Sequence, residues 1–178
     1  MRSSVYGFLA WLAATPALAG DAVPQLEAEL MAAPSATQFL TGRCAALKLA
    51  APPVIRAVRE NLEIKASADV RSALKVGADT PLRYRRVDLT CGTHVLSEAD
   101  NWYVPARLGD DMNRTLDTSE TPFGTVVKPL NFHRKTLKME ALDDPAHVLR
   151  VTAVLMTAEG RPFSLVVENY SRELTGGR

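Results

Sequence analysis

The chain has 178 residues, of which 47% are hydrophobic and 23% are charged, so it can bury a core and its composition argues against disorder. Lys and Arg total 21 against 20 Asp and Glu, a formal net charge of +1. That balance gives neither the basic field that favours nucleic acid nor an acidic run that favours cationic partners. The length suits one domain.

The first 19 residues have the pattern of a secretory signal peptide. Arg2 supplies a positive charge, an apolar run extends from Val5 to Ala14, and Ala17-Leu18-Ala19 is a small-residue cleavage motif. The apolar run is too short to span a bilayer, and no second one follows it. A buried core helix is the alternative. We expect residues 1–19 to be removed near Ala19 and residues 20–178 to form a single domain, periplasmic or secreted.

Two cysteines, Cys44 and Cys91, remain in the expected mature chain. Two interpretations stay open: one disulfide, which an exported protein allows, or two buried free thiols. The three histidines, at positions 94, 133 and 147, have no metal-ligand spacing, and no metal site is expected.

The N-terminal part of the mature chain has helical patterns. A first helix is expected over roughly Pro24–Ala32. Ser35 and Gln38 fit a capping box, and the apolar stripe after them, from Phe39 to Leu49, predicts a second helix. Residues 54–65 fit either a helix or a strand. Further helical turns are expected at residues 70–76 and 107–116.

From Pro81 onwards, alternating apolar and polar residues predict strands. These are expected at Leu82–Cys91, His94–Val104, Leu130–Met139, Val148–Thr157 and Pro162–Leu174. Glu159-Gly160, between the last two strands, is a hairpin signal. Consecutive strands favour an antiparallel sheet with helices on one side, which is an α+β domain.

Three segments in this half of the chain resemble the chorismate lyases. They are Arg86-Val87-Asp88-Leu89-Thr90-Cys91 with the strand that ends at Val104-Pro105, Glu120-Thr121-Pro122-Phe123-Gly124 before the strand with Arg134, and Gly160-Arg161-Pro162 leading to Glu168. Their order and approximate spacing match over about residues 82–172. The resemblance implies an antiparallel sheet of about six strands, with N-terminal and inserted helices packed over it and a ligand enclosed between them.

Chorismate lyases split chorismate into 4-hydroxybenzoate and pyruvate without a metal or cofactor. The resemblance implies that Arg86 grips the ring carboxylate and that Glu168 faces the hydroxyl or ether-oxygen end, with contacts from Phe123 and Gly124. A guanidinium binds a carboxylate bidentately, and a carboxyl in an apolar cavity can act as a general acid. The alternative for Glu168 is a structural ion pair with an arginine.

One departure from the family concerns Asn101, which stands where the family usually carries a second arginine. One carboxylate anchor is then missing, and Arg85, Arg107 or Arg134 is a candidate to replace it. Export is the second departure, because chorismate is made in the cytoplasm.

The expected function is therefore that of an exported chorismate lyase-like enzyme, with Arg86 and Glu168 as catalytic residues pointing into one cavity. The alternative is a non-catalytic periplasmic protein that binds a small aromatic carboxylate, because a related sheet serves as the effector-binding domain of some transcription regulators. A structural envelope protein is a third hypothesis. The expected protein is a monomer without cofactor, nucleic-acid partner or membrane span. The expected substrate-binding residues are Arg86, Asn101, Phe123, Gly124 and Arg134.

Overall fold

The computed structural model describes residues 22–176, so the expected signal peptide lies outside the described residues. The helices are α1 (Ala22–Ala32), α2 (Ala36–Ala46), α3 (Ala68–Ala73), α4 (Asp110–Thr118) and α5 (Phe123–Val126). The strands are β1 (Ile55–Glu60), β2 (Arg83–Cys91), β3 (His94–Tyr103), β4 (His133–Ala141), β5 (His147–Met156) and β6 (Pro162–Ser171).

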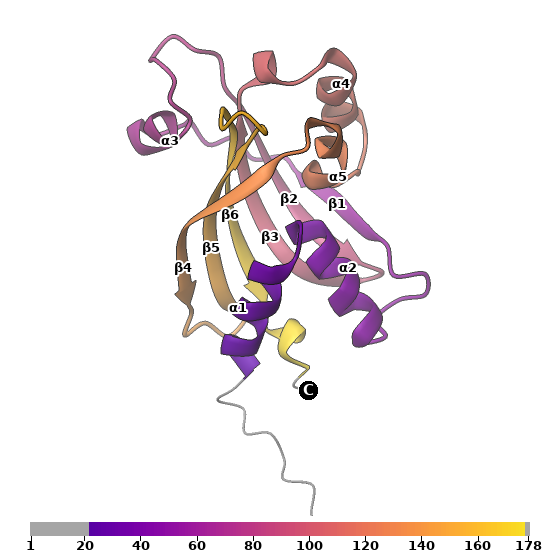
Figure 1. Cartoon of the computed structure of the whole chain (residues 1–178). Helices are drawn as coiled ribbons and strands as arrows, with labels where there is room; N and C mark the ends of the chain where they lie inside the picture. Colours follow the sequence, from indigo (N-terminus) through magenta and orange to yellow (C-terminus); the bar gives the residue numbers. More distant parts are fainter. Residues whose placement is uncertain (1–21, 177–178) are drawn as a thin grey trace, which may run out of the picture.

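The strands form one antiparallel six-stranded sheet in the order β1-β2-β3-β6-β5-β4. In Figure 1, α1 and α2 lie in front of the lower part of the sheet, α4 and α5 lie at the upper right, and α3 lies at the upper left. The predicted α+β fold class is confirmed. The ambiguous segment at residues 54–65 contributes the edge strand β1.

The central strands place alternate side chains on a helix-covered face and on the opposite face. On the covered face, Val87, Ala99, Glu168 and Val151 lie opposite one another across β2, β3, β6 and β5. A carboxylate therefore lies in an otherwise apolar row, and Val87, Ala99 and Glu168 of this row line a cavity.

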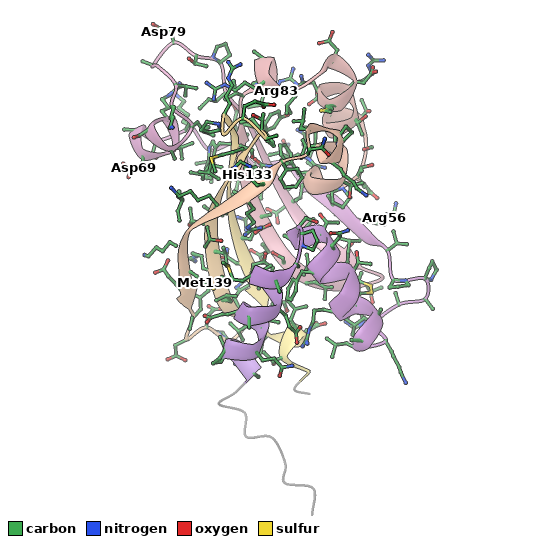
Figure 2. All side chains as sticks on the ribbon, in the orientation of Figure 1. Arg56, Asp69, Asp79, Arg83, His133 and Met139 are labelled. Carbon is green, nitrogen blue, oxygen red and sulfur yellow. A yellow bond between two sulfur atoms is a disulfide. The ribbon has the colours of Figure 1, made fainter. Side chains whose placement is uncertain are left out.

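Figure 2 shows the side chains that the helices and the sheet carry, and three clusters of buried apolar residues join these elements. Beneath α1 and α2, the ring of Phe39 packs edge-on against that of Tyr170, with centroids 5.9 Å apart. A second apolar cluster joins α4 and α5 to Phe163 of β6. A third packs α3 against Trp102 on the opposite face of the sheet. The helices are thus held on the sheet by burial of apolar surface.

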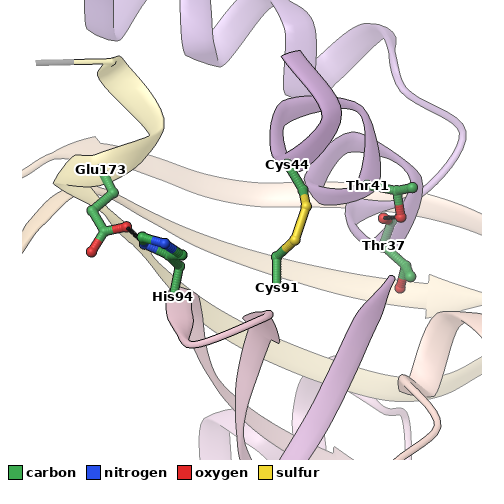
Figure 3. The surroundings of a disulfide bond; sticks show 6 residues. All are labelled: Thr37, Thr41, Cys44, Cys91, His94 and Glu173. Atoms are coloured by element: carbon green, nitrogen blue, oxygen red, sulfur yellow. Dashed lines mark hydrogen bonds and ion pairs between the residues drawn. A yellow bond between two sulfur atoms is a disulfide. The ribbon is translucent and has the colours of Figure 1, made fainter. Parts of the chain in front are cut away.

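A disulfide joins Cys44 of α2 to Cys91 at the end of β2 (Figure 3), with the two Cα atoms 6.2 Å apart. Both cysteines are fully buried. Of the two alternatives for the cysteines, the disulfide is confirmed. It ties α2 to the sheet on the side of the helix that faces the core.

The longest helices between residues 22 and 176, α1 and α2, have 11 residues each. A membrane-spanning helix needs about 20 apolar residues. Over this part of the chain, no helix has both the length and the apolar character to cross a membrane.

Candidate functional site

A cavity lies between the covered face of the sheet and the first turns of α2 and α5. Its volume, measured as the space that the centre of a water molecule can reach, is about 50 Å³. One water needs about 10–15 Å³ on this measure, so the cavity has room for several waters or for one small organic molecule. Its lining consists of Ser35, Ala36, Thr37, Arg85, Val87, Leu89, Ala99, Asn101, Pro122, Phe123, Gly124, Phe132, Arg134, Leu155, Val166 and Glu168.

Two short backbone segments close the cavity on the side away from the sheet. The α2 segment begins at its N-cap Ser35, whose hydroxyl accepts a hydrogen bond from the backbone N–H of Gln38. This confirms one half of the expected capping box. The α5 segment approaches α2 so closely that a Cβ at Gly124 would lie 3.1 Å from Thr37 Oγ1. The absence of a side chain at Gly124 thus allows the two segments to close over the cavity.

Arg85 is the most deeply buried charged residue of the cavity wall, with 2% of its surface exposed. Its Nη2 lies 3.4 Å from each of two backbone carbonyl oxygens, those of Ser119 and Thr121, and its buried Nε has no hydrogen-bond partner. Across residues 22–176, no carboxylate lies within 4.0 Å of this guanidinium to form a salt bridge. Burial, and then the like charge of Arg59, lowers the pKa of Arg85.

Glu168 and Arg134 form an ion pair on another part of the cavity wall. Arg134 Nη2 lies 2.6 Å from Glu168 Oε2, and the Tyr170 hydroxyl donates to the same oxygen at 2.9 Å. Burial lowers the pKa of Arg134, but the charge and hydrogen bond of Glu168 outweigh it, and the pKa is raised overall. Burial, followed by the negative charge of Glu168, raises the pKa of Tyr170 well above its ordinary value. The three side chains therefore satisfy one another.

Asn101 lies directly opposite Arg85 in the pairing of β2 with β3. It is 4% exposed, and its Oδ1 accepts a hydrogen bond from the buried hydroxyl of Ser164. This contact orients the amide, with the Nδ2 donor on the other side. The cavity thus has a neutral donor beside an unpaired guanidinium.

The structure does not place Arg86 in this cavity, so the expectation that Arg86 and Glu168 point into one cavity is wrong. Because side chains alternate along a strand, Arg86 lies on the face opposite Arg85. There it forms ion pairs with Glu60 at 2.9 Å, Glu98 at 2.7 Å and Asp100 at 3.1 Å. A guanidinium with three carboxylate partners has no free side for a ligand in the cavity.

The other expected site residues are brought together: Asn101, Phe123, Gly124, Arg134 and Glu168 all line the cavity. Their roles in binding stay predictions. Arg107 lies elsewhere and donates to the carbonyl oxygens of Leu74 and Pro162. In the sequence, Arg85 is one of three candidates for the second arginine that binds a carboxylate. Alternation along the strand places Arg85 and Arg86 on opposite faces, and this pattern could have identified Arg85 as the residue at the cavity.

Among residues 22–176, no three His, Cys, Asp or Glu side chains lie close enough together to hold a metal ion. The polar side chains that line the cavity instead carry guanidinium, amide, carboxylate and hydroxyl groups. Such groups bind and orient a small organic ligand.

The fold is shared with proteins of known structure. The crystal structure of PhnF from Mycobacterium smegmatis matches with a TM-score of 0.53 and 12% identity over 78% of this chain and 64% of that chain. The effector domain of PhnF matches with a TM-score of 0.51 and 9% identity over 67% of this chain and 82% of that chain. The part of PhnF that matches is an effector domain of a GntR-family transcriptional regulator, and it has the chorismate lyase-like fold. This similarity concerns the fold, and the chain spans less than two thirds of full-length PhnF.

The chain belongs to the same family as the uncharacterized protein y4mC of Sinorhizobium fredii. The two are 37% identical over 174 residues, which cover 84% of this chain and 73% of that protein. No protein-family model matches the chain, and this includes any model of the chorismate lyases.

These comparisons correct the expected function. The structural neighbours are ligand-binding domains of regulators, so the prediction of a lyase that eliminates pyruvate from chorismate is wrong. The site agrees with this correction, because Arg86 is outside the cavity and Glu168 is already bonded to Arg134 and Tyr170. The part of the resemblance that stands is the chorismate lyase-like fold.

Proposed function

We propose that this protein is a non-catalytic, effector-type ligand-binding domain whose cavity takes a small organic anion. The observation that carries the proposal is Arg85, a residue with 2% of its surface exposed that lines the cavity and has no carboxylate partner among the described residues. Burial of an unpaired charge is costly. An anion in the cavity would offset that cost.

The contacts that Arg85 makes within the protein leave room for such a ligand. Its two hydrogen bonds to the carbonyl oxygens of Ser119 and Thr121 are long, at 3.4 Å each, and its Nε is unpaired. A carboxylate or phosphate group accepts two parallel N–H bonds from a guanidinium, which is a stronger interaction than two long contacts with neutral carbonyls.

The start of α2 adds to this preference for an anion. Ser35, Ala36 and Thr37 line the cavity, and Ser35 caps the N–H of Gln38. The first N–H groups of a helix have no acceptor inside the helix, and the helix dipole places partial positive charge at this end. The apolar floor, formed by side chains such as Val87, Leu89 and Val166, suits the carbon skeleton of the ligand.

A matched pair of variants tests the proposal. Arg85→Met removes the guanidinium from the cavity, whereas Arg86→Met removes the adjacent guanidinium from the opposite face. Benzoate, hexanoate and inorganic phosphate serve as probes, and calorimetry and thermal unfolding measure their binding. A probe at ten times its Kd adds about 1.4 kcal/mol of stability, which raises Tm by about 3–5 °C.

We expect at least one probe to stabilise the wild type and Arg86→Met but not Arg85→Met. Comparison of the three probes separates an organic carboxylate from a free phosphate. Equal binding by Arg85→Met and the wild type would overturn the proposal, as would failure of the wild type to bind any of the three anions.

Three earlier expectations stay predictions. The first is export, for which the signal-peptide pattern lies outside residues 22–176 and with which a buried disulfide agrees, because disulfides persist in oxidising compartments. Mass spectrometry of protein from the native cell would show a start near residue 20 if the signal peptide is removed. The monomeric state and the lack of a nucleic-acid partner are the other two.

A further inference from the structure

The charged side chains of the cavity wall define how much negative charge a ligand can carry. Among residues 22–176, three charged residues line the cavity, namely Arg85, Arg134 and Glu168. Arg134 and Glu168 form an ion pair at 2.6 Å, so their charges compensate each other. Arg85 remains, and the described wall has a net charge of +1.

Asn101 makes the surroundings of Arg85 polar without adding charge. It is the cross-strand partner of Arg85, and directly opposite residues of an antiparallel pair have Cβ atoms about 4.5–5.5 Å apart. Ser164 donates its hydroxyl hydrogen to Asn101 Oδ1, which turns the Nδ2 group away from Ser164. Within residues 22–176, Nδ2 makes no hydrogen bond of its own. The cavity therefore offers a neutral N–H donor next to the guanidinium.

On the basis of the proposed function, we infer that the site selects a monoanion that carries a neutral hydrogen-bond acceptor beside its acidic group. The acidic group binds Arg85, and a hydroxyl, ether or carbonyl oxygen accepts from Asn101. A dianion is rejected, because its second charge would leave water without gaining a cation. Asn101 is then the residue that determines specificity, and Ser164 is a positioning residue that orients its amide.

A series of isosteric variants changes the cavity charge in single steps. Asn101→Asp places a carboxylate beside Arg85 and brings the net charge to zero, while Glu168→Gln frees Arg134 and brings it to +2. The probes are salicylate, which has a hydroxyl next to its carboxylate, phthalate, which has a second carboxylate there, and benzoate, which has neither. Calorimetry at neutral pH gives the affinities.

For the wild type, we expect salicylate to bind more tightly than benzoate, and benzoate more tightly than phthalate. Asn101→Asp should lose at least tenfold in salicylate affinity, and its Tm without ligand should rise because Arg85 gains a partner. Glu168→Gln should shift the ratio of phthalate to salicylate affinity at least tenfold towards phthalate. Ser164→Ala serves as the positioning control, in which the preference for salicylate over benzoate falls while benzoate still binds.

The outcomes separate this inference from the function on which it rests. If the wild type binds phthalate as tightly as salicylate, and Arg85→Met binds neither, the proposed anion site stands and the inferred selectivity is wrong. If no probe binds and Asn101→Asp does not melt at a higher temperature, both are wrong. Should Glu168→Gln fail to fold, Asn101→Asp decides alone, because unchanged salicylate affinity in that variant overturns the inference.

Discussion

Arg85 and Arg86 are consecutive residues of β2, yet they lie on opposite faces of the sheet and in opposite electrostatic surroundings. Arg85 is buried at the cavity with two long contacts to carbonyl oxygens. Arg86 forms ion pairs with Glu60 of β1 and with Glu98 and Asp100 of β3. One guanidinium thus lines the cavity, and the other links strands on the opposite face of the sheet through its ion pairs.

The network around Arg86 predicts a large loss of stability in Arg86→Met. The substitution leaves three carboxylates close together without their shared cation, although the Arg86 side chain is 19% exposed and water screens part of the effect. Removal of one partner from a buried pair costs about 3–5 kcal/mol, so we expect about 2–4 kcal/mol here. Thermal unfolding at neutral pH should show a Tm lower by about 5–10 °C. A change of less than a degree would contradict this account.

Asp88 lies close to the same carboxylates, and removal of its charge should stabilise the protein. Its pKa is raised above the ordinary value of 3.8, first by burial and then by the charges of Glu60 and Glu98. Because the folded pKa exceeds the unfolded one, the stability linked to this group is full below pH 3.8 and is lost as the pH rises through the folded pKa. Above its folded pKa, the ionised Asp88 therefore destabilises the fold.

Asp88→Asn should accordingly raise Tm at pH 7 by about 1–3 °C, and the gain should disappear as the pH falls through the folded pKa of Asp88. Differential scanning calorimetry over a pH series measures both parts. Asp79→Asn, in an exposed loop, serves as the control and should show no such pattern. A gain that is independent of pH would show that charge is not its cause.

Most of the sheet could be predicted from the sequence because its signals are local. Alternation marked β2 and β3 to within one residue at each end, and Gly92 between them adopts the left-handed backbone conformation of a tight turn, with φ of 59°. Residues 54–65 could not be assigned in this way. Their strand, β1, is an edge strand that is fixed by pairing with β2, which is a contact distant in sequence.

The candidate site was harder to predict, because a shift of one residue in a strand moves a side chain to the other face. Short motifs placed the guanidinium at Arg86, whereas Arg85 occupies the cavity. Glu168 was placed in the cavity correctly, but its partner could not be derived. Arg134 reaches it from β4, which is separated from β6 in the sheet by β5.

The Cys44–Cys91 disulfide should contribute substantially to stability. It closes a sequence separation of 47 residues, for which the loop-entropy relation gives about 4 kcal/mol. Replacement of both cysteines by alanine should lower Tm by about 8–15 °C. Because the bond is buried, its reduction needs a thiol reductant together with a denaturant. This treatment should lower the Tm of the wild type and leave the Tm of the double variant unchanged. Recovery of two alkylated cysteines from the untreated, denatured protein would contradict the bond.

The contact between α5 and α2 gives the last prediction. A Cβ at Gly124 would lie 3.1 Å from Thr37 Oγ1, which is tighter than an ordinary van der Waals contact. Gly124→Ala should therefore force the two cavity-closing segments apart and destabilise the protein by about 1–2 kcal/mol. Thr37→Ala removes the obstructing hydroxyl, so the double variant should recover most of that loss. Denaturant unfolding of the four proteins in this cycle gives the coupling energy, and strictly additive effects would show that Thr37 is not what requires glycine at position 124.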